Sequence, residues 1–359
     1  MNLLIGSSKG LIVYHRNING NWIPGDVHFE GFPISATYVN PNSKTWWVAV
    51  AHRHWGIKLF TSKDKGKNWI PKTTPAYPSD AFLKNGKPAV LKKIWCIASP
   101  PGFDHQILLI GTEPGGLFIS YDDGHTFQLL NSLWNHPTRS EYWFGAGRDL
   151  PFIHSIQFDP IDSNHFFIAV SCAGIFETLD GGKSWEIRNK GLKAAYLPNP
   201  DTEFGHDPHL LLMGKSNPMV LWQQNHCGIY RSVDQGKNWV DVSGENGFPN
   251  YGFAIAVDEL DPLKAWVIPA QSDDMRIAVN RSLIVCFTKD GGLTWQNQQL
   301  GLPQEYCFDI VFRHAFVKHL NTLAFGTSTG NLFISENEGM EWNAITHYLP
   351  RIENLAFDY

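Results

Sequence analysis

One short pattern, Ser/Thr-x-Asp-x-Gly-x-x-Trp/Phe, occurs six times in this chain of 359 residues. The copies begin at Ser62, Ser120, Thr178, Ser232, Thr288 and Ser335, and the last copy has Asn337 in place of the aspartate. A unit that recurs at similar intervals along most of a chain is typical of stacked or radial architectures. The repeat therefore restricts the fold more strongly than any single segment does.

Each copy has the composition of a tight turn between two β-strands. An aspartate can accept hydrogen bonds from main-chain amides a few residues later, and a glycine tolerates a positive φ. The aromatic residue then opens the next strand and buries a large ring. Because a turn already accounts for these aspartates, we interpret them as structural and not as catalytic acids or metal ligands.

The segments around the six copies predict four-stranded units, in which strands A, B and C precede the turn and strand D follows it. The expected A strands are residues 34–39, 93–98, 153–158, 209–213, 253–257 and 308–312. The N-terminus supplies B, C and D strands at residues 3–5, 10–14 and 21–23, but no A strand. Residues 352–357 at the C-terminus have the character of the missing strand, so the sequence predicts a seventh unit built from both ends.

The repeat resembles the Asp-box, or BNR repeat, of sialidase-like and sortilin-like β-propellers, and its copies cover nearly the whole chain. With the strand count, the resemblance implies one all-β domain over residues 1–359, a seven-bladed β-propeller with Asp-box turns. Pairing of the C-terminal strand with the N-terminal blade would close the ring and remove open sheet edges. Three turn segments look most like single-domain bacterial BNR-repeat proteins of uncertain activity: residues 111–116, 206–209 and 225–228.

The chain departs from the sialidase pattern within this superfamily. Sialidases have six blades, an arginine triad that begins in an Arg-Ile-Pro-like segment, a Tyr–Glu pair and an acidic Asp. Arg16 and Arg53 are the only arginines before the first repeat, and neither lies in such a segment. The nearest approximation, at Arg276, comes late in the chain. Classical sialidase activity is therefore not expected.

Composition excludes several classes of partner. The net charge is −5 and no block of Lys or Arg occurs, which argues against binding nucleic acid or an anionic membrane. No apolar run reaches the length needed to span a bilayer. The N-terminus lacks the features of a secretion signal, and the five cysteines suggest no disulfide framework. We expect a cytoplasmic location.

Functional residues are expected in the loops, since one propeller fold hosts many activities. Propellers place their B–C and D–A connections on one face, and several here are long, at residues 71–91, 131–151, 189–208 and 270–282. We expect a His-rich polar funnel there, at the mouth of the channel. Its candidate ligand-binding residues are His52, His54, Trp55, Trp143, Asp207, His226, Asp274 and Arg276.

Three interpretations of the histidine-rich face remain open. In acid–base catalysis, His154 or His209 would work beside Glu113. A divalent metal, which nothing in the sequence requires, would be held by a carboxylate and some of His54, His154, His209 and His226. In the third interpretation, the imidazoles only hydrogen-bond to loop main chain.

These features predict an Asp-box β-propeller that binds a small polar ligand, carbohydrate or anionic, or a peptide segment. Trp55, Trp134 and Trp143 are the tryptophans left over after the strands and turns are assigned, so they are candidates for stacking on a ligand. One alternative is a glycoside hydrolase or lyase-type enzyme, with or without a metal. Glycosidase chemistry would need two carboxylates about 5–9 Å apart. The other alternative is a protein-binding assembly scaffold.

Overall fold

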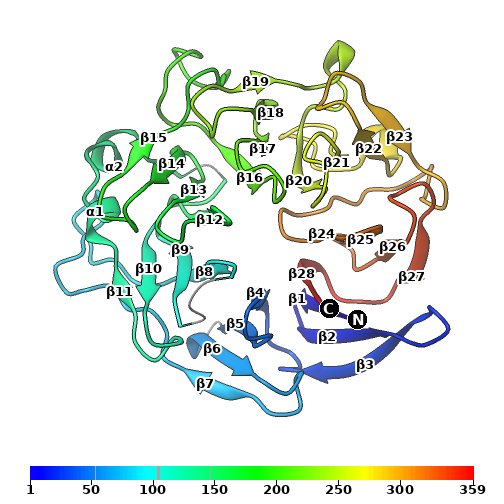
Figure 1. The fold of residues 1–359 in the computed structure, drawn as a ribbon, viewed down its shortest axis with the longest axis horizontal. Coiled ribbons are helices and arrows are strands. Elements are labelled where there is room, and N and C mark those ends of the chain that lie inside the picture. Colours follow the sequence, from blue (N-terminus) through cyan, green and yellow to red (C-terminus); the bar gives the residue numbers. More distant parts are fainter. Residues whose placement is uncertain (53, 103–105, 146) are drawn as a thin grey trace. The chain divides into compact units, whose positions relative to one another are not determined.

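The computed structural model describes all residues except 53, 103–105 and 146. Its strands form seven four-stranded sheets, the blades of a β-propeller (Figure 1). This confirms the predicted seven-bladed fold. Contacts divide the chain into two compact units, one of residues 1–34, 190–201 and 209–359 and the other of residues 35–189 and 202–208.

The first unit contains four of the sheets. One sheet combines strands from both ends of the chain, in the order β28 (Ile352–Asp358), β1 (Asn2–Ser7), β2 (Gly10–Arg16) and β3 (Trp22–His28). The other three sheets follow chain order: β16 (Pro208–Met213), β17 (Leu221–Asn225), β18 (Gly228–Ser232), β19 (Val240–Asp241); β20 (Gly252–Val257), β21 (Ala265–Pro269), β22 (Val285–Thr288), β23 (Gln296–Gln298); β24 (Phe316–His319), β25 (Thr322–Gly326), β26 (Leu332–Ser335), β27 (Asn343–Thr346).

The second unit contains the other three sheets, again in chain order. These are β4 (Ile34–Val39), β5 (Trp46–His52), β6 (Gly56–Ser62), β7 (Ile70–Lys72); β8 (Lys93–Ala98), β9 (Leu108–Glu113), β10 (Leu117–Ser120), β11 (Gln128–Leu129); β12 (Ile153–Phe158), β13 (Phe166–Val170), β14 (Gly174–Thr178), β15 (Glu186–Ile187).

Helices are few and short. The α-helices of the described residues are α1 (Asn131–Trp134) and α2 (Pro137–Tyr142), which lie in the long connection after β11, and single 3-10 turns lie at Glu245–Gly247 and Val279–Arg281. None of the helices in the described part of the chain is long and apolar enough to cross a membrane.

The second strand is buried along its whole length in four of the sheets, those that contain β9, β13, β17 and β21. All five residues of β13 are buried, as are all six of β9. Ile168 of β13 belongs to one core cluster with Leu109 of β9, so both faces of these strands pack on neighbours within the second unit. Burial on both faces explains why these segments are continuous apolar runs without alternation.

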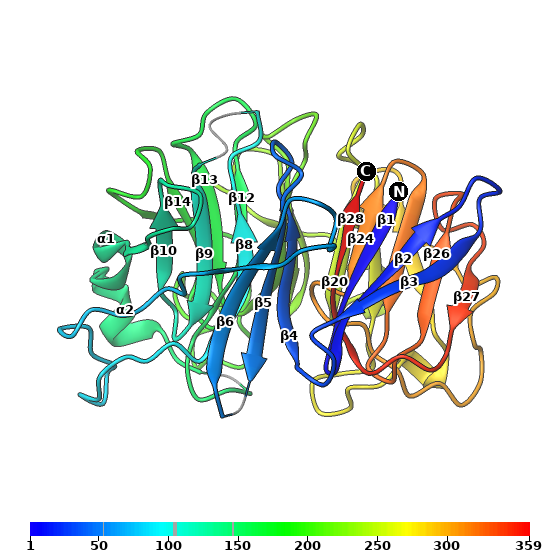
Figure 2. The same cartoon turned by 90° about the horizontal axis from the view of Figure 1, so that it is seen from below.

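The C-terminal strand completes the N-terminal sheet. β28 pairs antiparallel with β1, with Leu3 opposite Phe357 and Ile5 opposite Leu355, and the two strands lie side by side in both views (Figures 1 and 2). The side-chain amide of Asn2 also donates a hydrogen bond to Oδ2 of Asp358, with Nδ2 at 2.8 Å. The predicted closure through the two chain ends is therefore confirmed.

One predicted A strand is wrong. The inner strand of the β24–β27 sheet is Phe316–His319, with Val317 opposite Ala324, and residues 308–312 form no strand. The alternation of apolar residues at 308, 310 and 312 imitates a strand. Its main chain instead contacts the turn after β25, where Ile310 N donates to Ser328 Oγ at 3.2 Å and Ile310 O accepts from Ser328 N at 2.9 Å.

The six repeat turns share one hydrogen-bond arrangement. In the copy at Thr178, the threonine hydroxyl donates to Asp180 Oδ1 at 2.8 Å and accepts from Gly182 N at 2.8 Å. The same carboxylate accepts from Ser184 N at 2.9 Å and from the Ser184 hydroxyl at 2.6 Å. In the last copy, Asn337 Oδ1 accepts from the Ser335 hydroxyl and from Glu341 N. An amide oxygen therefore preserves the two main contacts of the aspartate.

Glycine in the repeat turn satisfies two constraints at once. Gly292 has φ of +87°, a conformation that other residues resist. A Cβ atom at this position would also lie 2.6 Å from Cβ of Val242 in the preceding sheet. The aromatic residue of the same turn reaches that sheet too, because Trp295 Nε1 donates to Val242 O at 2.8 Å. This turn thus helps to join the β20–β23 sheet to the β16–β19 sheet.

Deleting residues 352–359 should abolish cooperative unfolding. The deletion removes three buried apolar side chains, Ile352, Leu355 and Phe357, and leaves β1 as an open edge. Thermal melting and size-exclusion chromatography would then show a broad transition and aggregation. Removal of Tyr359 alone, which lies beyond β28, is the matched control and should leave a cooperative melt. A cooperative monomer after the longer deletion would contradict this account.

Asp180→Ala should lower the free energy of unfolding by about 1 kcal/mol, because it removes the acceptor for several hydrogen bonds. Asp180→Asn should cost less, since Asn337 performs the same role in the last copy. The hydrogen bond from Ser184 lowers the pKa of Asp180 to about 2, against about 3.9 in an unfolded chain. The carboxylate's contribution is therefore present above pH 4 and lost as the pH falls towards 2.

Denaturant titrations of both variants at pH 7 and pH 3 would measure these differences. Equal stability of wild type and Asp180→Ala at pH 7 would refute the structural role of the aspartate.

Candidate functional site

Sheet topology brings two kinds of loop to the same end of each blade. In an up-and-down sheet, the A strand begins where the B strand ends, while the repeat turn lies at the opposite end. In the β16–β19 sheet this places the start of β16 beside the turn between β17 and β18. His209 is the second residue of β16, and His226 follows β17.

His209 is buried and its orientation is fixed. Its Nδ1 lies 2.6 Å from the main-chain oxygen of Gly252, and its ring stacks on Phe253 with centroids 4.6 Å apart. A carbonyl oxygen can only accept a hydrogen bond, so Nδ1 carries the proton and donates. In the neutral imidazole, the lone pair is then on Nε2.

Aromatic rings surround His226 in the same unit. Its ring lies edge-on to Tyr196, His209 and Tyr251, at centroid distances of 5.1, 5.6 and 5.7 Å. The side chain keeps 22% of its surface exposed. His226 is therefore the solvent-facing member of the pair of imidazoles.

Asp273 connects these rings to Arg276. Its Oδ1 accepts from the Tyr251 hydroxyl at 3.1 Å and from Arg276 Nε at 3.1 Å, and its Oδ2 lies 3.9 Å from Nε2 of His226. Burial opposes ionisation of Asp273, but the hydrogen bond and charge of Arg276 outweigh it and lower the pKa of this carboxyl group. Burial raises the pKa of Tyr251, so its hydroxyl remains a donor at neutral pH.

The guanidinium of Arg276 lies over an aromatic ring. Its Cζ is 5.5 Å from the centroid of Phe253, and Cζ of Arg313 is 5.3 Å from the same centroid. The Arg276 side chain is 48% exposed. We call the group formed by these side chains the Tyr251 cluster, which comprises His209, His226, Tyr251, Phe253, Asp273 and Arg276.

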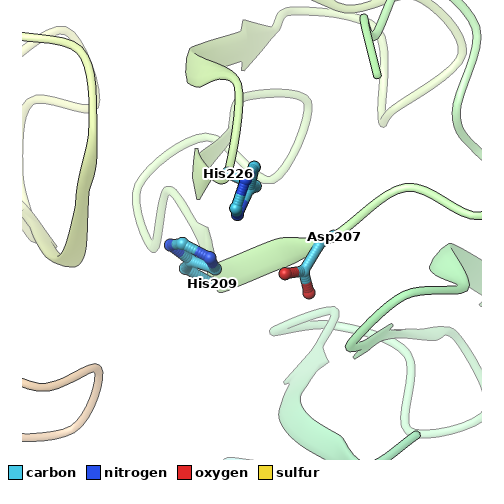
Figure 3. A group of neighbouring side chains, drawn as sticks. All are labelled: Asp207, His209 and His226. Carbon is cyan, nitrogen blue, oxygen red and sulfur yellow. The ribbon is translucent and has the colours of Figure 1, made fainter. Parts of the chain in front are cut away.

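Two imidazoles of this cluster lie close together. A ring nitrogen of His209 lies within 4.8 Å of a ring nitrogen of His226, and Figure 3 shows the two side chains. Asp207 belongs to the second unit, where its Oδ1 accepts from the Ser171 hydroxyl at 2.7 Å and from Cys172 N at 3.2 Å.

Glu113 belongs to a separate group in the second unit. The buried carboxylate accepts from Trp95 Nε1 at 3.2 Å and forms an ion pair of 3.1 Å with Arg148. Trp95 stacks on Phe152 with centroids 4.0 Å apart, and Nζ of Lys93 lies 3.8 Å from the centroid of its ring. Glu113 is thus held by an indole and a guanidinium.

His154 has the contacts of a structural histidine. It is fully buried, its Nε2 lies 2.8 Å from the main-chain oxygen of Pro208, and its Nδ1 lies 2.9 Å from the Ser155 hydroxyl. Nε2 therefore donates to the carbonyl, and Nδ1 accepts from the hydroxyl. This arrangement favours the interpretation of His154 as a group that ties main chain together over its use as an acid–base catalyst.

His52 organises the turn after β5. Its Nδ1 accepts hydrogen bonds from His54 N at 3.1 Å and Trp55 N at 3.0 Å. Trp55 is 74% exposed. Arg53, in the same turn, lies outside the described residues.

Trp134 and Trp143, which were candidates for stacking on a ligand, are buried. Trp143 is 1% exposed, packs on Phe176 with centroids 5.2 Å apart and donates to Thr138 Oγ1 at 3.2 Å. Trp134 is also buried and lies under the guanidinium of Arg139. Both rings hold down the helical connection after β11, so Trp143 is not available to stack on a ligand.

The structure therefore brings together some of the predicted residues and adds others. His209, His226 and Arg276 belong to one cluster, whereas Glu113, His154 and His54 have other surroundings. Asp274, which was predicted, is exposed, and its neighbour Asp273 makes the contacts. Tyr251 and Phe253 were missed as site residues. The available signal was two aromatic residues, spaced two apart, at the start of an expected A strand.

Known proteins resemble this chain in fold. No family model matches the chain, and no curated protein matches its sequence. Among solved structures, it is similar to a GH74 enzyme of Niastella koreensis, with a TM-score of 0.54 and 14% identity over 95% of this chain and 64% of that one. The chain thus spans less than two thirds of the length of this enzyme.

Two further structures are similar over most of both chains. YCF48 bound to D1 peptide gives a TM-score of 0.55 and 13% identity over 87% of this chain and 83% of that chain. A putative 6-phosphogluconolactonase from Bacteroides fragilis gives a TM-score of 0.60 and 11% identity over 99% and 97%. At these identities, the similarity shows the β-propeller fold that this chain shares with enzymes and with a peptide-binding protein.

Proposed function

We propose that this chain is a ligand-binding β-propeller of the Asp-box type, and that its Tyr251 cluster binds the anionic group of a small polar ligand or peptide. The observation that carries the proposal is the setting of Arg276. Its guanidinium is half-exposed, lies over Phe253 and is oriented by Asp273. An oriented guanidinium beside aromatic rings is suited to a carboxylate or phosphate attached to a flat or apolar group.

The contact with Asp273 defines how an anion would approach. Asp273 Oδ1 contacts Nε and Nη2 of Arg276, which form one edge of the guanidinium. A carboxylate would bind through the other edge, formed by the two Nη atoms, in the paired geometry that guanidinium groups favour. The ion pair with Asp273 pre-orients the side chain, so less conformational entropy is lost when the ligand binds.

The rings of the cluster supply the second element of recognition. His226 is partly exposed and lies against Tyr196 and Tyr251, which form an amphipathic wall next to Arg276. Aromatic rings with polar edges suit contacts with a sugar face or a peptide side chain. The similarity in fold to YCF48 bound to a peptide supports the peptide version of this proposal, and the similarity to GH74 enzymes supports the carbohydrate version.

A hydrolytic enzyme is the second candidate, and Glu113 is the residue that favours it. A buried carboxylate hydrogen-bonded to an indole is the kind of group that glycosidases use. Glu113 also forms an ion pair with Arg148, however, and a carboxylate with a purely structural role would make the same contact. We therefore place binding before hydrolysis.

Binding should depend on Arg276 and not on the nearby Arg281. Isothermal titration against peptides with free and amidated C-termini, and against neutral and acidic oligosaccharides, would identify the ligand class. Arg276→Ala should weaken binding of the anionic ligands by about ten-fold or more, because one charge-assisted contact is lost. Arg281→Ala is the matched control, since Arg281 is an exposed arginine of the same connection, and should bind as wild type does.

Two outcomes would count against the proposal. Equal affinity of Arg276→Ala and wild type would place the ligand elsewhere. Cleavage of an oligosaccharide that is lost in Glu113→Gln but retained in Arg276→Ala would favour the enzyme alternative.

A further inference from the structure

We infer that the ligand of the Tyr251 cluster carries two acidic groups, one bound by Arg276 and the other by Arg313. This inference rests on the proposed anion site at Arg276 and deepens it, because it gives Arg313 a part in binding and restricts the ligand to dianions. Suitable ligands are a sugar with two phosphates, or a short peptide in which an acidic side chain precedes the C-terminal carboxylate. Carboxylate and phosphate share the paired oxygen atoms that a guanidinium recognises.

Both guanidiniums lie against one aromatic ring of the first unit. Cζ of Arg276 is 5.5 Å and Cζ of Arg313 is 5.3 Å from the centroid of Phe253. Since both atoms are this close to one point, they are at most about 11 Å apart. The His209 ring stacks on Phe253 and covers one face, which leaves the opposite face and the edges of the ring to the two arginines.

The sheet topology brings the two arginines together from different connections. Arg276 lies in the connection between β21 and β22, and Arg313 lies in the connection that leads into β24. Connections of these two kinds lie at the same end of the up-and-down sheets. Phe253 is the second residue of β20, so the ring between the arginines belongs to a strand. A rigid element therefore supports two cationic side chains from neighbouring loops.

Both positive charges also reach the hydroxyl group of Tyr251. Burial raises the pKa of this hydroxyl, and the charges of Arg276 and Arg313 oppose that rise. The Tyr251 ring lies edge-on to Phe253, with centroids 5.5 Å apart, so the two guanidiniums and the hydroxyl lie around the same ring. Like charges at short distance repel each other. A ligand with an acidic group for each arginine removes this repulsion, which favours a dianion over a monoanion.

The two side chains can be reached from solvent, and their spacing suits a short scaffold. The Arg276 side chain is 48% exposed, and Arg313 is partly exposed. At about 3.5 Å per residue, two or three amino-acid residues span about 7–10 Å. An acidic side chain near a C-terminal carboxylate therefore covers the separation of the two guanidiniums, and a sugar with phosphates at both ends covers a comparable distance.

Isothermal titration of the full chain with two matched pairs of probes tests the inference. The first pair is fructose 1,6-bisphosphate and fructose 6-phosphate. The second pair is the peptide acetyl-Asp-Gly-Gly with a free or an amidated C-terminus. In wild type, the doubly acidic member of at least one pair should bind about ten-fold or more tightly than its singly acidic partner, because a second charge-assisted contact forms. The pair that shows this ratio distinguishes a phosphate ligand from a carboxylate ligand.

Variants assign the second contact to Arg313. Arg313→Ala should bring the ratio close to one and leave the affinity for the singly acidic probe as in wild type, whereas Arg276→Ala should weaken binding of both probes. Arg313→Lys keeps the charge without the planar fork and should retain part of the ratio. Arg281→Ala, which changes an exposed arginine of the same unit, is the matched control and should keep the full ratio. Circular dichroism would show that each variant is folded.

The two proposals fail in different ways. Equal binding of both members of both pairs by wild type, or an unchanged ratio in folded Arg313→Ala, would overturn the second contact and leave the anion site at Arg276 intact. Singly acidic probes that bind Arg276→Ala as they bind wild type would contradict the anion site itself. Failure of wild type to bind any of the four probes would overturn the dianion inference.

Discussion

The hydrogen-bonded repeat turn is the interaction on which this structure depends. In each copy, a hydroxyl and a carboxylate or amide oxygen close a loop between the third and fourth strands, and a glycine allows the chain to reverse. The same turn directs an aromatic ring at the preceding sheet, as Trp295 does towards Val242. In this sheet, one local motif thus shapes the blade and joins it to its neighbour. The motif lies at one end of six of the seven sheets, so the loops at the other end do not contain it.

The Tyr251 cluster lies at that other end. His209 at the start of β16 and His226 after β17 are brought together by the pairing of two neighbouring strands, and Tyr251 approaches from the start of the next sheet. The cluster combines a fixed imidazole, a more exposed imidazole and an oriented guanidinium. Such a combination is more than packing requires, since Arg276 and His226 face solvent while Asp273 restrains Arg276. The anion binding that we propose rests on this arrangement.

The sequence was sufficient for most of the fold because the repeat fixes where each blade ends. The prediction was wrong at residues 308–312, a loop whose apolar residues alternate as they do in a strand. This alternation does not reveal that Asp309 accepts hydrogen bonds from Thr329 and Asn331. The candidate site was predicted in part. Topology brings His209 and His226 to the same end of one sheet, but it cannot choose between Asp273 and Asp274, which differ by one residue in an irregular loop. Nor could it show that Trp143 is buried, since that depends on how the connection after β11 folds onto Phe176.

The central claim is that this protein binds its ligand at the Tyr251 cluster. The most direct measurement is a long-range ¹H–¹⁵N spectrum of the histidine rings, recorded before and after addition of the tightest-binding anionic compound and assigned with single His→Gln variants. The account predicts that His209 is protonated on Nδ1, and that the signals of His209 and His226 shift while those of His154 and His347 do not. Shifts confined to His154, or a bound ligand that leaves His209 and His226 unchanged, would contradict it.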